Sequence, residues 1–514
     1  MSGGARIKVD QGRRIGEVDP RIYGGFIEHL GRCIYGGIFD EGSPLSDERG
    51  FRRDVLDALD QLSLTSLRWP GGLFANGYHW EDGIGARATR PRRFDPAWRD
   101  EDSNRFGTDE FIQYCRALGT EPAICVNMGT GTLSEAQAWV EYCNSSGNTH
   151  WANLRRRNGS EEPYRVKYWG LGNEMYGWYS IGGLEAEDYV KRATEFAKVM
   201  KAADPGIQLI SSGMNGWSRW DRIVLDGLAP LVDFHSVHIY TGSHDFYSNV
   251  FAPHQAERAL VACQGLISAI RYQQRIPHPI HIAYDEWNVW FRAGNPPWGS
   301  LEDVPSETRL EERYTLSDAL AVATFFNVFI RQCQTVRMAN LAQMVNVLAP
   351  IITSEKGLIL QSSYHVFRLY SRLMRGRAVD VHVDCDTYAL PPEEETSPWS
   401  HRVADLGPFN LLDAVAVRDH EAGTLTLAVV NRDLTRSMEA AVEIADVACP
   451  VGAVAYEVNG STVGAANSVE APGVVTVTER GAVSLGSSPT YQFPAHSLTV
   501  LRLDTGRSMR PGGD

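Results

Sequence analysis

The sequence has no uninterrupted run of about 18 apolar residues, the length that indicates a membrane-spanning helix. Its first residues, MSGGARIKVDQGRR, lack the apolar core of a secretory signal. We therefore expect no membrane partner and a cytoplasmic location.

Clustered positive charge is also scarce. The formal net charge is −14 at pH 7, whereas nucleic-acid binding rests largely on clustered Lys and Arg that neutralise phosphates. We therefore expect no nucleic-acid partner. The one basic run, Arg155 to Arg157, is interpreted as a solvated loop or a subunit contact.

Metal-binding patterns are missing as well. The eight cysteines are scattered, without a CxxC pair or other paired spacing, which favours buried free thiols over disulfides or zinc. In FHSVHIY, residues 234 to 240, strand alternation places His235 on the face opposite His238 and Tyr240, which argues against a His–His metal pair. We expect neither a metal nor a cofactor.

What the sequence does contain is a repeated unit, a short apolar strand with a polar end followed by a helix of 3.6-residue periodicity. The expected strands are 21–29, 65–72, 121–129, 166–174, 207–213, 234–240, 281–288 and 335–346, and the expected helices are 51–62, 108–118, 134–144, 185–204, 220–228, 255–275, 311–333 and 362–374. Eight such units predict an α/β fold, a (β/α)8 TIM barrel over residues 18–377.

The pattern changes near residue 378. Alternating apolar stretches such as TLTLAVVN and SLTVLRL, separated by Gly, Pro, Asn and Asp, predict an all-β, jelly-roll-like sandwich over residues 378–514. The strand within residues 1–17 precedes the barrel and is expected to join this sandwich.

Two barrel strands end on a glutamate. VKYWGLGNE closes on Asn173 and Glu174, and HIAYDEWN closes on Asp285 and Glu286. In (β/α)8 barrels the carboxyl ends of the strands build the active site. Since two carboxyl groups commonly cleave glycosidic bonds, we interpret Glu174 and Glu286 as a catalytic pair.

Other strand ends carry the partners that a sugar requires. These polar residues are Glu28, Arg68, Asn127, Asn173, His238, Tyr240 and Gln343, and the nearby aromatics are Trp69, Trp98, Trp178, Trp287 and Trp290. Carboxylates and amides bind hydroxyls, and aromatic rings stack on C–H faces. A phosphate site would instead need glycine-rich turns or clustered Arg and Lys.

Six strings carry a family resemblance that spans essentially the whole chain. They are GGFIEHLGRCIYGGIFDEGSPLSD, LRWPGG, YHWEDGIG, VKYWGLGNEMYG, IAYDEWNVW and LAQMVNVLAPI, in this order. With them the chain resembles glycoside hydrolase family 51, the α-L-arabinofuranosidases.

The resemblance implies a retaining double displacement. Glu174, in the GNE string, would be the general acid/base, and Glu286, in DEWN, the nucleophile. Asn173 would bind the sugar 2-hydroxyl, Tyr240 would orient the nucleophile, and His238 would lie near the acid/base.

Further binding residues follow from the same resemblance. Glu28 matches the substrate-binding glutamate of the family, and an ion pair with Arg68 is compatible with that role. The binding residues expected in all are Glu28, Arg68, Asn76, Trp98, Asn173, His238, Tyr240, Trp290 and Gln343.

One position departs from the family pattern. Many members place Asn directly after the two glycines of the second strand as a sugar ligand, whereas this chain has Leu73. Asn76 follows three residues later and is expected to substitute for it.

The leading hypothesis is an exo-acting hydrolase that releases α-L-arabinofuranosyl residues from arabinan or arabinoxylan oligosaccharides, assembled as a homo-oligomer, a hexamer or trimer of dimers. Because Leu73 departs from the family pattern, a hydrolase of another furanoside, or of a β-glucan or xylan, is an alternative. A metal-dependent sugar isomerase and a non-catalytic sugar-binding protein are the other classes. Linkage preference is expected to depend on the loops at residues 73–107 and 291–305.

Overall fold

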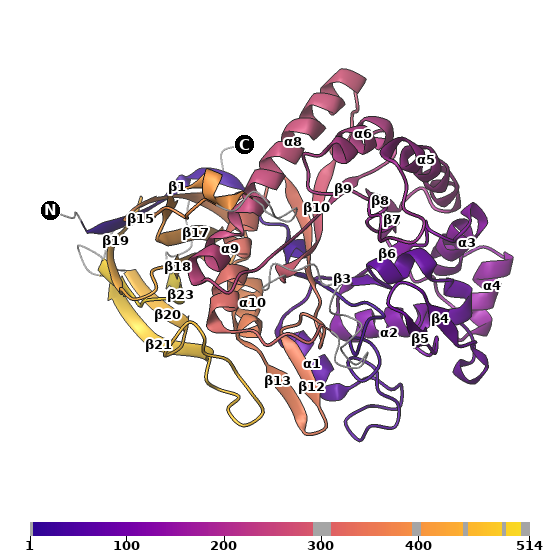
Figure 1. The fold of residues 1–514 in the computed structure, drawn as a ribbon, viewed down its shortest axis with the longest axis horizontal. Coiled ribbons are helices and arrows are strands. Elements are labelled where there is room, and N and C mark those ends of the chain that lie inside the picture. The colour runs from indigo at the N-terminus through magenta and orange to yellow at the C-terminus, as the bar shows by residue number, and fades with distance from the viewer. Residues whose placement is uncertain (1–3, 291–309, 393–401, 446–450, 486–489, 505–514) are drawn as a thin grey trace.

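A computed structural model describes residues 4–290, 310–392, 402–445, 451–485 and 490–504 of the chain. They form a closed parallel barrel and, beside it, a β-rich domain (Figure 1). The loop expected at 291–305 lies outside the described residues. No helix in the described ranges is long and apolar enough to cross a membrane.

The barrel confirms the predicted (β/α)8 fold. Its eight strands follow one another around the ring in chain order and pair in parallel. They are β2 (Gly24–Phe26), β3 (Ser66–Trp69), β6 (Glu121–Val126), β7 (Tyr168–Leu171), β8 (Gln208–Ser211), β9 (Phe234–Thr241), β10 (His281–Val289) and β11 (Val336–Ala342).

Helices cover the outside of this ring (Figure 1). Those predicted from the 3.6-residue pattern are α1 (Arg53–Gln61), α2 (Thr108–Leu118), α3 (Leu133–Asn144), α5 (Ala186–Ala203), α6 (Arg219–Leu228), α8 (His254–Gln274), α9 (Leu316–Arg331) and α10 (Ser362–Leu373), and α4 (His150–Arg157) and α7 (Phe246–Phe251) are additional. Apolar faces of these helices pack against the strands and build the core.

Side chains fill the barrel, so it is a packed core rather than a pore. One inward layer contains Ala123, Tyr168, Ile210, Phe234, Ala283 and Met338, one from each of six strands. Gly24 lets two strands approach closely, because a Cβ there would lie 2.3 Å from Ser66 Oγ and 2.7 Å from the Ala339 carbonyl oxygen.

The second domain is the predicted β-sandwich. Its strands are β1 (Ala5–Glu17), β14 (Arg377–Asp384), β17 (Leu412–Asp419), β18 (Thr424–Asn431), β19 (Met438–Ile444), β20 (Val451–Asn459), β21 (Thr476–Leu485), β22 (Thr490–Phe493) and β23 (Ser497–Asp504), hydrogen-bonded in the order β21-β20-β23-β18-β17-β14-β1-β19-β22. The amino-terminal strand β1 pairs antiparallel with β14 and parallel with β19, as expected from the sequence. Figure 1 shows this indigo strand among orange and yellow ones.

Some local expectations were wrong. The helix expected at 311–333 begins at Leu316, because the Thr315 amide and hydroxyl donate to Asp318 and cap it there. The basic run is the last turn of α4, not a loop. Arg155 in it is buried and donates to the carbonyls of Tyr142 and Ser145 at 2.8 and 2.9 Å.

The cysteines agree with the prediction of free thiols. Seven lie in the described residues and are unpaired, and six of these are buried. Cys449 lies outside the described residues.

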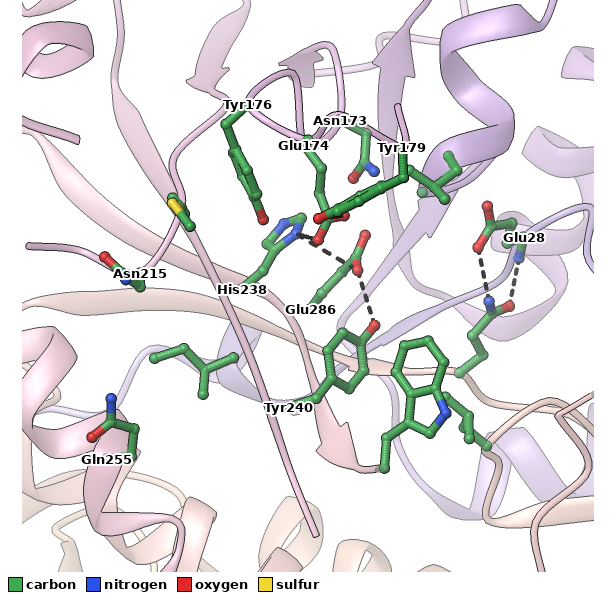
Figure 2. A pocket seen from close by; sticks show the side chains of 18 of the residues that line it. Glu28, Asn173, Glu174, Tyr176, Tyr179, Asn215, His238, Tyr240, Gln255 and Glu286 are labelled. Atoms are coloured by element: carbon green, nitrogen blue, oxygen red, sulfur yellow. Dashed lines mark hydrogen bonds and ion pairs between the residues drawn. The ribbon is translucent and has the colours of Figure 1, made fainter. Parts of the chain in front are cut away.

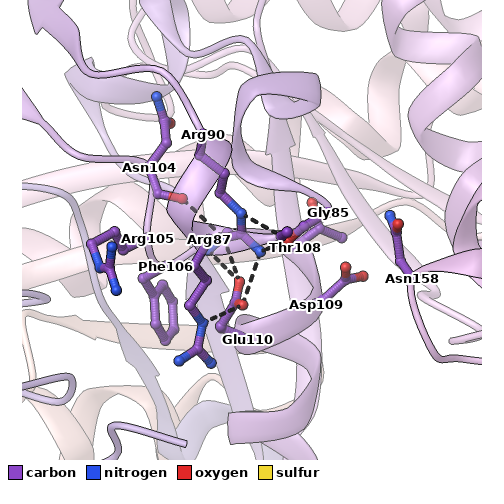
Figure 3. A network of polar contacts seen from close by, with 12 residues as sticks. Gly85, Arg87, Arg90, Asn104, Arg105, Phe106, Thr108, Asp109, Glu110 and Asn158 are labelled. Carbon is purple, nitrogen blue, oxygen red and sulfur yellow. Dashed lines mark hydrogen bonds and ion pairs between the residues drawn. The ribbon is translucent and has the colours of Figure 1, made fainter. Parts of the chain in front are cut away.

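The long loop between β3 and α2 is fixed by a buried ion-pair network (Figure 3). Glu110, in the first turn of α2, accepts from Arg90 at 2.9 and 3.0 Å and from Arg87 at 3.0 Å. Arg90 also donates to the Asn104 carbonyl at 2.9 Å and to that of Gly85 at 2.8 Å. These bonds tie the middle of the loop and its carboxyl-terminal end to one helix.

Replacing Glu110 with alanine is expected to lower the free energy of unfolding by about 3 to 5 kcal/mol, because it leaves the Arg90 charge buried without its partner. Urea unfolding measures this change. Glu101→Ala is the matched control, since the Glu101 and Arg92 side chains are 66% and 67% exposed and such pairs contribute about 0 to 1 kcal/mol. Equal losses in the two variants would contradict the network's role.

Candidate active site

The predicted site residues surround a cavity of about 1150 Å³ at the carboxyl ends of the barrel strands. It is lined by side chains from seven strand ends. Among the expected residues these are Glu28, Trp98, Asn173, Glu174, His238, Tyr240, Glu286, Trp290 and Gln343. The sequence therefore predicted nine of the residues that line the cavity.

Glu174 follows β7 at a sharp turn of the chain. Its φ of +45° is in the left-handed region, where non-glycine residues are uncommon and often functional. One carboxylate oxygen lies 3.0 Å from His238 Nδ1, and the other accepts from the Tyr179 hydroxyl at 3.0 Å. Burial by itself would raise the pKa of Glu174, but the hydrogen bond and charge of His238 outweigh it and lower the pKa.

Glu286 lies next to Glu174 and His238 in the cavity wall (Figure 2). Its Oε1 accepts from Arg68 Nη1 at 2.6 Å and its Oε2 from the Tyr240 hydroxyl at 2.9 Å. Both donors fix the carboxylate in position, and the guanidinium neutralises its charge.

A bulge in β10 turns two consecutive side chains into the barrel. Between Ala283 and Glu286 β10 advances by three residues, whereas the paired stretch of β9, from Ser236 to His238, advances by two. The bulge lies between Ala283, which belongs to the inward layer, and Trp287, which packs outward on α9. Strict alternation would place only one of Asp285 and Glu286 inside, so the bulge gives both to the site.

The inward-facing Asp285 side chain contacts His238. It accepts from Ser236 Oγ at 2.6 Å and lies 3.1 Å from His238 Nε2. Burial would lower the pKa of His238, but the charges of Glu286 and Asp285 outweigh it and raise the pKa to about 10. The imidazole is therefore protonated at neutral pH and donates from both nitrogens.

The same cluster is the candidate for a metal site. Single ligand atoms of Glu174, His238 and Glu286 lie within 4.8 Å of one another. A histidine ligand must be neutral, whereas both ring nitrogens of His238 contact carboxylates. The arrangement fits a protonated imidazole better than a metal ligand.

Asp285→Asn is expected to lower the pKa of His238, because it removes one of the charges that raise it. The folded-state pKa of about 10 lies above the unfolded value near 6.5, so protonated His238 stabilises the fold below pH about 6.5 and this contribution is lost as the pH rises toward 10. The free energy of unfolding should therefore fall less between pH 7 and 10 in Asp285→Asn than in the wild type. An equal fall would contradict this role.

Asn173 presents an unused donor to the cavity. Its Oδ1 accepts from Arg68 Nη2 at 2.6 Å, and its buried Nδ2 has no hydrogen-bond partner among the described residues. Buried polar groups are normally paired. The free Nδ2 therefore suits a ligand hydroxyl, in line with the predicted contact to the sugar.

The structure corrects two expected sugar ligands. Asn76 is fully buried and does not line the cavity; its Nδ2 donates to the Asn173 carbonyl at 2.7 Å and to Ser180 Oγ at 2.8 Å. Arg68 is also absent from the cavity wall, and it donates to Glu286 and Asn173. Both are positioning residues, because their side chains are committed to other site residues.

Glu28 and Gln343 form a reciprocal pair at one end of the cavity. Gln343 Nε2 donates to Glu28 Oε2 at 3.0 Å, and the Glu28 amide donates back to Gln343 Oε1 at 2.9 Å. Trp98 Nε1 donates to Glu28 Oε1 at 3.0 Å. Burial and the charge of Glu286 raise the pKa of Glu28 to about 8, and no ion pair joins it to Arg68 in the described residues.

Aromatic residues divide between wall and core. Trp98 and Trp290 line the cavity, and so does Trp178, which is 84% exposed. Trp69 and Trp287 are buried in the core. Leu73, the departure from the family pattern, lines the cavity and gives it an apolar patch where a sugar-binding Asn was expected.

Sequence reasoning missed Asp285, Tyr176 and Tyr179 as parts of the site. The two tyrosines flank Glu174 in Figure 2 and come from the loop that follows it. Their spacing in NEMYGWY offered a weak signal, since aromatic residues beside a catalytic strand end are often wall residues.

Comparisons with known proteins agree with this geometry. Residues 58–258 match the model of the α-L-arabinofuranosidase 1 domain, and residues 285–497 match that of the α-L-arabinofuranosidase C-terminal domain. The chain is 44% identical to a probable α-L-arabinofuranosidase C of Aspergillus clavatus, over 96% of each protein.

Two further relatives are bacterial. An intracellular exo-α-(1→5)-L-arabinofuranosidase of Halalkalibacterium halodurans is 36% identical over 84% of this chain and 86% of its own. The structure of a GH51 α-L-arabinofuranosidase from Thermotoga petrophila superposes with a TM-score of 0.88 at 40% identity, covering 97% of this chain and 99% of that one. The chain therefore belongs to glycoside hydrolase family 51, the α-L-arabinofuranosidases.

Proposed function

We propose that this α-L-arabinofuranosidase is a retaining, exo-acting enzyme in which Glu286 is the nucleophile and Glu174 the general acid/base. Its substrates would be arabinan and arabinoxylan oligosaccharides with terminal arabinofuranosyl residues. The observation that carries the proposal is the approach of Glu174 and Glu286 oxygens to within 4.8 Å. Retaining enzymes hold their carboxyl groups about 5 to 5.5 Å apart and inverting ones about 6.5 to 9.5 Å.

In the first step Glu286 attacks the anomeric carbon while the bond to the leaving oxygen breaks. Glu174 gives its proton to that oxygen, and a covalent arabinosyl ester forms on Glu286. Arg68 and Tyr240 hold the attacking carboxylate, and Asn173 Nδ2 is placed for the sugar hydroxyl, where contacts strengthen in the transition state.

The acid's proton has a source in the site. The pKa of Glu174 is lowered by His238, which would leave Glu174 ionised at neutral pH. His238 Nδ1 lies 3.0 Å from its carboxylate, so transfer along this hydrogen bond gives neutral Glu174 and neutral His238. Asp285 then holds the remaining proton on Nε2.

In the second step the roles reverse. Ionised Glu174 takes a proton from water, the water oxygen attacks the anomeric carbon, and the ester bond to Glu286 breaks. Two inversions at one carbon retain the configuration.

The relatives support the finer parts of this proposal. The Halalkalibacterium protein is named an intracellular, exo-acting enzyme, which supports the exo mode and a cytoplasmic location here. A homo-oligomer, a hexamer or trimer of dimers, remains an expectation from the family resemblance. Light scattering of the purified protein tests it.

The substrate is tested by a hydrolysis panel with aryl α-L-arabinofuranoside, galactofuranoside, xyloside and glucoside. We expect the arabinofuranoside to be preferred. Preference for another sugar would favour the alternative substrate classes. The change in specificity would then be attributed to Leu73, which lines the cavity.

A further inference from the structure

His29, which follows Glu28 in the FIEH string, is a buried residue that the proposed mechanism does not use. Trp69 Nε1 lies 3.0 Å from its Nε2, and its Nδ1 contacts Asp102 Oδ2. Since an indole nitrogen can only donate, Nε2 accepts, and the imidazole proton on Nδ1 is donated to Asp102. His29 and Asp102 are 7% and 5% exposed, so this hydrogen bond is shielded from water.

Asp102 belongs to the hairpin that carries Trp98. The hairpin consists of β4 (Arg93–Asp95) and β5 (Asp100–Asp102), which pair antiparallel, and Trp98 lies in the turn between them (Figure 1). Near the turn, the Asp95 carboxylate accepts from the Trp98 amide at 3.1 Å. Asp102 is paired with the first residue of β4 and therefore lies at the open end of the hairpin.

The Asp102 carboxylate accepts hydrogen bonds on both oxygens. His29 donates to Oδ2, whereas the Tyr35 hydroxyl donates to Oδ1 at 2.9 Å and the Asn104 amide at 2.5 Å. Two of these donors, His29 and Tyr35, belong to the segment that follows β2. Asp102 therefore attaches the hairpin to the segment that also contains Glu28.

Both donors to Glu28 Oε1 depend on this attachment. They are Trp98 Nε1 at 3.0 Å and the Phe74 amide at 3.1 Å. The Phe74 ring stacks on the His29 imidazole, with centroids 4.5 Å apart and planes 8° apart. His29 therefore supports one donor through its ring and the other through Asp102.

Open space adjoins the hairpin on two sides. A cavity of about 330 Å³ is lined by His29, Tyr35, Trp98 and Asp102 among others. Trp98 also lines the catalytic cavity, so it borders both spaces. Packing alone therefore leaves room for the ring to shift, and the hydrogen bonds of the hairpin fix its position.

We propose that His29 and Asp102 form a positioning pair, which fixes the two donors of Glu28 Oε1 and thereby the affinity for the arabinofuranosyl ring. Neither residue lines the catalytic cavity, so both act through Glu28. This inference rests on the proposed function, because it takes Glu28 as a ligand of the sugar. An interaction that holds the ring equally in the ground state and the transition state changes KM rather than kcat.

Asp102→Asn tests the pair with little change in shape. The amide offers one acceptor where the carboxylate has two, so its N–H group must face a donor, either His29 Nδ1–H or the Asn104 amide. His29 cannot adapt by moving its proton to Nε2, because Trp69 donates there. We expect KM for an aryl α-L-arabinofuranoside and the inhibition constant of L-arabinose both to rise about tenfold, with kcat within about twofold of the wild type.

Asp100→Asn is the matched control. It removes the same charge from the same strand, but Asp100 is exposed and its carboxylate accepts from the Glu101 amide at 2.8 Å. Both constants should stay within about twofold of the wild type.

Tyr35→Phe is a milder second variant, because it removes one donor to Asp102 and keeps the ring. Its KM and inhibition constant should rise about threefold. A merely structural role would reduce the folded fraction, which lowers kcat and leaves both constants unchanged. Unchanged constants in Asp102→Asn would overturn the inference, and if that variant does not fold, unchanged constants in Tyr35→Phe would do so.

Glu28→Gln separates the positioning pair from the site that it supports. It should lower kcat/KM by about tenfold or more, because the carboxylate itself is lost. This loss together with unchanged constants in Asp102→Asn would overturn the positioning pair alone. An unchanged kcat/KM in Glu28→Gln would exclude Glu28 as a sugar ligand and overturn the inference with it. Absence of wild-type activity on the aryl arabinofuranoside would instead overturn the proposed function.

Discussion

Glu286→Ala should lower kcat on an aryl α-L-arabinofuranoside by about 10⁵-fold or more, as expected when a nucleophile is removed. Without this carboxylate the covalent ester on Glu286 cannot form. Arg68 keeps a partner in Asp285, 3.4 Å from its Nε, so the fold should survive the change. Steady-state kinetics with calorimetric binding of arabinose separates lost chemistry from lost binding.

Azide gives this variant a stereochemical signature. It can enter the space of the missing carboxylate and displace the leaving group directly, which yields a β-configured arabinosyl azide by a single inversion. A loss of only about tenfold in kcat, or an α-configured azide, would contradict the assignment of Glu286.

Glu174→Ala should lower kcat/KM on arabinobiose by about 10² to 10⁴-fold, the usual effect of a general acid. The loss should be much smaller on a dinitrophenyl arabinofuranoside, because that leaving group departs without a proton. Azide should then restore turnover by attacking the covalent ester, and the product should be the α-azide after two inversions. Uniform losses on all substrates without rescue would contradict the role.

The two azide products make the experiments controls for each other. Opposite configurations are expected from the two variants, although both remove a glutamate from the same cavity. Tyr179 and His238, which contact Glu174 at 3.0 Å, are unchanged in both.

Much of the fold followed from local sequence patterns. An apolar run that ends on a charged residue marks a barrel strand and its carboxyl end, so Glu174 and Glu286 could be placed in one site although 112 positions separate their numbers. The amino-terminal strand was predicted in the sandwich because no barrel unit was left for it to join.

The partners of inward side chains were harder to predict. Arg68 and Asn76 are polar residues near a strand end, as expected of sugar ligands, but long-range packing decides that they bind Glu286 and the Asn173 backbone instead. A sequence pattern predicts on which face of a strand a side chain lies. It does not predict whether that side chain reaches the cavity or is buried behind the residues that line it.

Asp285 was missed for a different reason. Period-two alternation allows one of two adjacent residues to face inward, and the bulge that turns both inward depends on the register with β9. Asn215 and Gln255 also line the cavity but were not predicted, because Asn215 lies in the loop after β8 and Gln255 in the first turn of α8.

The most direct test of the catalytic pair is proton NMR of the first product formed from an aryl α-L-arabinofuranoside. With carboxylate oxygens within 4.8 Å, a double displacement should release α-L-arabinofuranose before mutarotation. Initial release of the β anomer would mean a single displacement and would contradict Glu286 as nucleophile.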